Sequence, residues 1–178
     1  GIEASGIGIT VANINGTQIG GRRNLVINGS MQVAQRGSSS TSNGYQTVDR
    51  YNMNSSGHDE APTQSQADVA SGTSPYAEGF RKSLKITNGN QTSGAGAADR
   101  LRILYIIEAQ DMANSGWNYT DSNSKVTLSF WIKSSVAQNF YFRATTSDGT
   151  THNFPMETGA LTANTWTKIT KTIPGNSN

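Results

Sequence analysis

The chain has no cysteine among its 178 residues, so no disulfide bond can stabilise it. Charged residues are scarce, at 15% of the chain, and hydrophobic residues reach only 34%. Disordered chains are usually rich in charge and poor in aromatics, whereas this chain combines low charge with 8% aromatics. The composition therefore predicts a folded protein of ordinary domain size, made of β-structure with long polar loops.

The distribution of charged and apolar residues argues against nucleic acid and membranes as partners. The net charge is only +2, and the 14 basic residues are scattered without a long run, so no electrostatic footprint for nucleic acid stands out. No apolar run approaches the roughly 18 residues that a membrane-spanning helix needs. We therefore expect neither a nucleic-acid partner nor membrane insertion.

Motifs of catalysis and metal binding are missing as well. The sequence contains no GxSxG, HExxH, P-loop or EF-hand pattern. His58 and His152 lack metal-ligand spacing, and residues 58–60 fit a solvated loop better than a cation site. Glu108 and Asp111 could form a glycosidase-like carboxylate pair, but polar positions near a strand end are commonplace. We expect a protein that is not an enzyme and that uses no cofactor or metal.

What the sequence does contain is a series of short alternating segments with turn-rich joints between them. The strand candidates are residues 46–53, 63–69, 83–87, 100–109, 126–134, 140–146, 152–157 and 166–173. About eight short strands joined by turns are typical of an antiparallel β-sandwich or jelly roll. A helical turn is expected at residues 111–114, ending at Gly116.

Three of these segments carry specific signals. Residues 125–133, KVTLSFWIK, alternate strictly and predict a half-buried antiparallel strand whose apolar face holds Val126, Leu128, Phe130 and Ile132. Residues 101–107, LRILYII, are apolar on both faces and predict a central strand, although a short buried helix would fit the same pattern. Asp148-Gly149 between two aromatic segments predicts a hairpin.

The segment RRNLVINGSMQVAQRG, residues 22–37, places an Asn-Gly turn at Asn28 and Gly29 between two short alternating strands. A two-residue hairpin there would put the apolar faces of the two strands on opposite sides of the sheet. We therefore expect a corner or a wider loop. Asp49-Arg50, a little further on, is the best candidate for a structural ion pair that ties a strand end.

The same segment, with Val48-Asp49-Arg50-Tyr51, resembles the opening of a β-sandwich domain of bacteriophage tail-fibre proteins. LRILYIIEAQDM, VTLSFWIKSS and TANTWTKITKTIPG, in this order, are similar to the jelly-roll domain of those fibres. TLSFWIKSS is also similar to carbohydrate-binding modules with the galactose-binding-like sandwich. The resemblance covers roughly residues 22–178 and implies a jelly-roll domain there.

Residues 1–21 differ from the rest because they are rich in Gly and Ile and almost uncharged. We expect an extended stalk or linker that oligomerises, with docking on its own domain as the alternative. Proteins that the chain resembles continue beyond Pro174-Gly175 with further strands that complete the sandwich. The last strands are therefore expected to be missing from this chain, or to be supplied by a neighbouring subunit.

The candidate binding residues are Trp117 and Tyr119, which lie in a polar loop. Flat aromatic rings pack against the C–H faces of sugars, and large exposed aromatics often mark binding sites. The competing interpretation is that these aromatics are packed inside the protein, which we favour for Trp131 and Trp166.

The resemblance implies a virion structural protein, most simply a tail-fibre segment that attaches to the host surface through multivalent glycan contacts. Its expected partners are copies of itself in a homotrimer, other virion tail or capsid proteins, and a host-surface glycan. One alternative is a capsid-bound fibre or tail adaptor without receptor contact. Another is a carbohydrate-binding module of a secreted glycan-degrading enzyme.

Overall fold

The protein consists of antiparallel β-strands, as the sequence predicts, with two short helices. The structure is a computed structural model that describes residues 13–14, 17–18, 24–146 and 149–176. Its strands are β1 (Asn13–Ile14), β2 (Thr17–Gln18), β3 (Ser39–Ser40), β4 (Tyr51–Ser56), β5 (Thr63–Asp68), β6 (Lys82–Thr87), β7 (Arg100–Tyr105), β8 (Lys125–Ile132), β9 (Asn139–Thr145), β10 (Asn153–Ala160) and β11 (Thr167–Pro174). The helices are α1 (Ser74–Ala77) and α2 (Ala109–Asn114).

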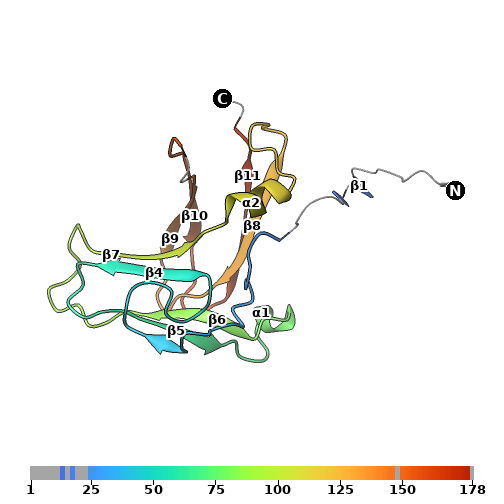
Figure 1. Cartoon of the computed structure of the whole chain (residues 1–178). Helices are drawn as coiled ribbons and strands as arrows, with labels where there is room; N and C mark the ends of the chain where they lie inside the picture. Colours follow the sequence, from blue (N-terminus) through green and yellow to red (C-terminus); the bar gives the residue numbers. More distant parts are fainter. Residues whose placement is uncertain (1–12, 15–16, 19–23, 147–148, 177–178) are drawn as a thin grey trace, which may run out of the picture.

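The strands form small sheets rather than one large one. β3, β5 and β6 make a three-stranded sheet, while β4 pairs with β7, β8 with β11, and β9 with β10, all antiparallel. Figure 1 shows the β4–β7 pair running above the β3–β5–β6 sheet, with the β8–β11 and β9–β10 pairs rising beside them. The T-shaped contact of Phe130 with Phe142, 5.3 Å between ring centroids, joins the two rising pairs.

Most predicted strands are confirmed within one or two residues at their starts. In β8, Val126, Leu128 and Phe130 are half-buried while Lys125, Thr127 and Ser129 are exposed, which confirms the predicted alternation. The hairpin expected at Asp148-Gly149 is present as the β9–β10 pair, although Asp148 lies outside the described residues.

Two predictions about strand bounds are wrong. The strand expected at residues 46–53 begins only at Tyr51, because Arg50 has a φ of 77°, which interrupts extended backbone. The opening segment has no strand between residues 24 and 37, since a turn occupies residues 27–30. Asn28 takes the left-handed conformation of that turn with a φ of 57°.

Helix α1 was not predicted from the sequence, although Pro75 in its first turn is a usual start signal.

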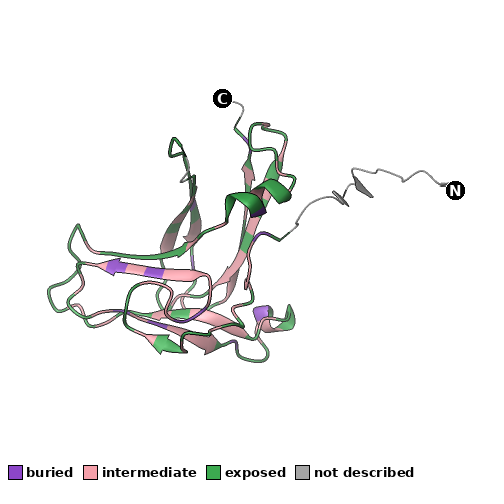
Figure 2. Cartoon of the chain, in the orientation of Figure 1, coloured by how far each residue is buried: buried purple, intermediate pink, exposed green. Residues whose placement is uncertain are grey.

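The prediction that residues 101–107 form a central strand is also wrong for the described part of the chain. β7 pairs with β4 alone, and Leu101, Ile103, Leu104 and Ile106 are between 38% and 60% exposed. Figure 2 shows β7 as mostly exposed along its length. Apolar residues on both faces signal burial on both faces, but only the fold decides whether neighbouring strands cover them.

The core lies between the two lower sheets and at the base of the rising pairs. Its buried apolar residues are Leu25, Val48, Met53, Val69, Met156, Leu161 and Ile169. Gln64 of β5 is also buried, with 1% exposure, and its polar atoms are all engaged. Its side chain accepts a hydrogen bond from Thr47 at 3.1 Å and donates to the carbonyl oxygens of Ser42 (2.7 Å) and Gly44 (3.3 Å). These hydrogen bonds of Gln64 hold the 42–47 loop against β5.

The N-terminal stalk expected at residues 1–21 lies almost entirely outside the described residues. Only β1 and β2 belong to it, and they pair antiparallel with each other. In the described part of the chain, no helix has the length and apolar character needed to cross a membrane.

Candidate functional site

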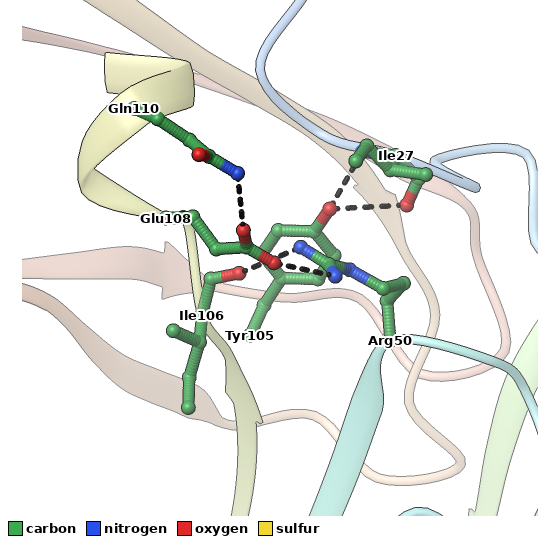
Figure 3. A network of polar contacts seen from close by, with 6 residues as sticks. All are labelled: Ile27, Arg50, Tyr105, Ile106, Glu108 and Gln110. Carbon is green, nitrogen blue, oxygen red and sulfur yellow. Dashed lines mark hydrogen bonds and ion pairs between the residues drawn. The ribbon is translucent and has the colours of Figure 1, made fainter. Parts of the chain in front are cut away.

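The side chain of Arg50, at the entry to β4, is held by groups that follow β7. Its guanidinium donates to Glu108 Oε1 at 3.0 Å and to the carbonyl oxygen of Ile106 at 3.4 Å, as Figure 3 shows. The hydrogen bond that Arg50 donates to Glu108 is the largest of the causes that raise the pKa of Arg50. Arg50 is therefore a fixed cation at the junction of β4 and β7.

The hydroxyl of Tyr105, the last residue of β7, fixes the chain that enters the domain. It accepts a hydrogen bond from the backbone N–H of Ile27 at 2.6 Å and donates to the carbonyl oxygen of Ile27 at 3.1 Å. The Tyr51 ring lies beside it, 5.1 Å between centroids. Burial, with a smaller contribution from Tyr105, raises the pKa of Tyr51 to about 12.

The carboxylate of Glu108 is engaged on both oxygens. Oε1 accepts from Arg50, while Oε2 accepts from the side chain of Gln110 at 2.8 Å. Both carboxylate oxygens therefore act as acceptors for neighbouring side chains. Asp111 is buried on α2 rather than exposed beside it. This arrangement gives no support to a glycosidase-like pair of Glu108 and Asp111.

A hollow of about 360 Å³ opens next to this network. Its lining consists of Arg36, Tyr45, Arg50, Ile106 and Glu108, and we call it the arginine hollow. Arg36 precedes β3 and Tyr45 lies between β3 and β4, whereas Ile106 and Glu108 come from the β7–α2 connection. The volume falls in the range of small-molecule sites, about 300–1,000 Å³. The lining combines an aromatic ring, an aliphatic side chain and three ionised groups.

The charges of the hollow do not cancel. Two guanidinium groups and one carboxylate line it, and Arg50 and Glu108 neutralise one another as an ion pair. Arg36 is exposed, and within the described residues its guanidinium has neither a hydrogen bond nor an ion pair. Among the described residues, the guanidinium of Arg36 is therefore open to an anionic ligand.

Comparisons with protein-family models, with curated proteins and with solved structures found no match for the chain. Within the described residues, no group of three or more His, Cys, Asp or Glu side chains is placed to hold a metal ion. The arginine hollow offers hydrogen bonds, charge and an apolar surface to a ligand.

The predicted binding residues Trp117 and Tyr119 lie elsewhere, in the loop between α2 and β8. Trp117 is half-buried, and its indole N–H donates to the carbonyl oxygen of Ser124 at 3.2 Å, which closes the loop. Tyr119 is 67% exposed. The structure thus separates the pair into an inward residue that shapes the loop and an outward residue that is free to contact a ligand.

The other two tryptophans are half-buried. Trp131 of β8 donates its indole N–H to Glu78 at 3.1 Å, and Glu78 also pairs with Lys168 at 2.9 Å. The hydrogen bond from Lys168, and then that from Trp131, lower the pKa of Glu78. The Trp166 ring lies 5.3 Å from the ammonium of Lys133. The contacts of Glu78 attach the β8–β11 pair to the end of α1.

Of the residues expected to be structural, Arg50 lines the hollow, while Asn28 and Asp49 hold the backbone of residues 33–35. Asn28 donates its side-chain amide to the carbonyl oxygens of Val33 (2.9 Å) and Asp49 (3.0 Å). Asp49 accepts a hydrogen bond from the backbone N–H of Gln35 at 3.1 Å. Arg50 forms its ion pair with Glu108 and not with the neighbouring Asp49. Gly29 follows Asn28 in the turn.

Sequence reasoning missed Arg36, Tyr45 and Ile106 as site residues. Arg36 lies in the segment of residues 22–37 and Tyr45 lies in a polar connection, so neither has a spacing that marks a site. The only available signal was an arginine beside a glycine in a segment already singled out. Their proximity to Glu108 is a product of the fold.

Proposed function

We propose that the chain is a structural component of a phage virion, a tail-fibre segment that attaches to the host surface through glycan contacts. The resemblance of its ordered motifs to tail-fibre jelly rolls supports this proposal, as does the antiparallel all-β architecture. In this proposal residues 22–178 form a jelly-roll domain, and several copies on one particle add their weak affinities into firm attachment.

The arginine hollow is the observation that carries the glycan-binding part of the proposal. Sugars present hydroxyl groups that need hydrogen-bond partners and C–H faces that pack on apolar surface. The hollow provides donors in Arg36 and Arg50, an acceptor in Glu108, and apolar surface in Tyr45 and Ile106. Exposed Tyr119, on a separate loop, provides a second aromatic contact.

A panel of purified bacterial surface polysaccharides tests this function. We expect the protein to bind at least one of them, and we expect Tyr45→Ala to weaken that binding. Tyr141→Ala is the matched control, because Tyr141 is 80% exposed on β9 and does not line the hollow. Binding that survives Tyr45→Ala unchanged would remove the hollow from the proposal.

The oligomeric state separates the fibre from its alternatives. A stable trimer that binds glycan favours the tail fibre, and a trimer that binds none favours a capsid-bound fibre or tail adaptor. A monomer that binds soluble glycan favours a carbohydrate-binding module of a secreted enzyme. Sedimentation equilibrium of the full chain, beside the polysaccharide panel, distinguishes the three.

A further inference from the structure

The arginine hollow contains two guanidinium groups in different situations. Arg50 is occupied, because Glu108 and the Ile106 carbonyl both accept its hydrogen bonds. The guanidinium of Arg36 is unpaired, since no described residue forms a hydrogen bond or an ion pair with it. The five N–H donors of a guanidinium form a planar fork that matches a carboxylate.

The backbone beside Arg36 is fixed although its side chain is not. The preceding residue, Gln35, donates its N–H to Asp49 Oδ1 at 3.1 Å, and Asp49 donates its own N–H to Val33 O at 2.9 Å. A side chain whose backbone is already held in place loses less conformational entropy on binding than a side chain on a flexible loop. Arg36 is therefore prepared to receive an anion.

We propose that the arginine hollow binds an acidic sugar unit, with the sugar carboxylate on Arg36. This inference rests on the proposed glycan-binding function and names the class of glycan. Arg36 forms a bidentate pair with the carboxylate, and the ring of the sugar lies along Tyr45 and Ile106.

Glu108 distinguishes a sugar acid from a bare inorganic anion. Its carboxylate lies in the same hollow and accepts hydrogen bonds, which the hydroxyl groups of a sugar acid can donate and a bare anion such as sulfate cannot. A carboxylate oxygen has more than one acceptor site, so Glu108 can still accept from sugar hydroxyls while it holds Arg50 and Gln110. One free cation next to one acceptor matches a ligand with one carboxylate and several hydroxyls.

Titration of the full chain with sodium glucuronate, glucuronamide, glucose and sodium sulfate tests the inference by NMR. The readouts are the side-chain Nε–H signal of Arg36 and the ring signals of Tyr45. Glucuronamide has nearly the size and shape of glucuronate without its charge. We expect glucuronate to shift these signals and to bind at least about ten-fold more tightly than glucuronamide, the factor that one charge-assisted hydrogen bond typically gives.

Three variants assign the effect to Arg36. Arg36→Gln should reduce glucuronate binding to the level of glucuronamide, and Arg36→Lys should fall between, because it keeps the charge and loses the fork. Arg143→Gln is the control, since Arg143 is an exposed arginine of β9 that does not line the hollow. Each variant's amide spectrum shows whether it is folded.

The remaining outcomes contradict the inference in different ways. Equal affinity for glucuronate, glucuronamide and glucose would overturn the acidic specificity and leave the glycan-binding function in place. Sulfate that shifts Arg36 as strongly as glucuronate would show anion binding without sugar recognition. No shift in the hollow with any of the three sugars would overturn the inference, while the polysaccharide panel would still decide the glycan-binding function. A loss of binding only in Arg143→Gln would move the acid site to β9.

Discussion

At the scale of single residues, Tyr51 makes the stability of the fold sensitive to alkaline pH. Its pKa is raised to about 12, first by burial and then by Tyr105, whereas an unfolded tyrosine titrates near 10. A group whose folded pKa is raised contributes stability that is fully present below the unfolded pKa and is lost as the pH rises. We therefore expect the free energy of unfolding to fall between about pH 10 and pH 12.

Urea unfolding at several pH values, wild type against Tyr51→Phe, measures this dependence. The variant should show a shallower decline, and its absorbance titration at alkaline pH should lack the last tyrosine to ionise. Identical slopes for the two proteins would contradict the assignment to Tyr51.

Also at the residue scale, the two aromatics of the α2–β8 loop should differ on substitution. Tyr119→Ala should weaken attachment to polysaccharide or host cells without changing the unfolding midpoint, because the ring is 67% exposed. Trp117→Phe should lower stability, because the carbonyl oxygen of Ser124 loses the indole donor and keeps only the backbone N–H of Gly175. Binding assays paired with thermal unfolding separate the two roles, and unchanged binding in Tyr119→Ala would exclude this loop as a contact.

At the scale of elements, Gly175 controls how the end of β11 meets the 118–121 loop. A Cβ at this position would lie 2.7 Å from the carbonyl oxygen of Asn118 and 2.9 Å from the carbonyl carbon of Tyr119. Both are backbone atoms, and the loop is also fastened by the hydrogen bond from Asn176 N to Tyr119 O at 2.7 Å. We expect Gly175→Ala to destabilise the protein by about 1–3 kcal/mol, the usual cost of overpacking.

Gly96→Ala is the matched control for this substitution. Its Cβ would meet only the side chain of Asp99, at 3.4 Å or more, which is ordinary contact. Chemical denaturation should therefore leave Gly96→Ala much closer to the wild type than Gly175→Ala. Equal stability of the two variants would show that the 118–121 loop yields easily.

At the scale of the whole molecule, a buried polar side chain substitutes for part of a small apolar core. Gln64 fastens Thr47 and the carbonyl oxygens of Ser42 and Gly44 to β5. Gln64→Leu removes the acceptor of the buried Thr47 hydroxyl and a donor to the carbonyl oxygens of Ser42 and Gly44, although Gly44 keeps the hydrogen bond from the Met53 N–H. A buried unsatisfied group costs about 1–3 kcal/mol. We expect a loss of about 2–4 kcal/mol in the free energy of unfolding.

Gln138→Leu provides the comparison, because Gln138 is exposed and the same chemical change there touches no buried network. Calorimetry of both variants measures the difference. A Gln64→Leu protein as stable as the wild type would mean that apolar contacts replace the lost hydrogen bonds.

The β class and most strand positions could be predicted because they depend on local patterns. A period of two along residues 125–132 places alternate side chains on opposite faces wherever the strand finally packs. The predicted start of β4 was wrong because Arg50 departs from extended backbone, and no sequence pattern indicates its φ of 77°. The predicted central position of β7 was wrong for a different reason, since an apolar segment does not specify how many neighbouring strands will cover it.

By itself, the sequence determined the antiparallel β character, the turns and the loop that presents Tyr119. Only the tertiary structure decided that Arg50 pairs with Glu108 and that Arg36 and Tyr45 share a hollow with them. The physical reason is range: alternation and turn preference act between neighbours in the chain, whereas ion pairs and hollows depend on which strand ends the fold brings together. Arg36 and Glu108 lie far apart in the sequence, and the meeting of β4 with β7 makes them neighbours.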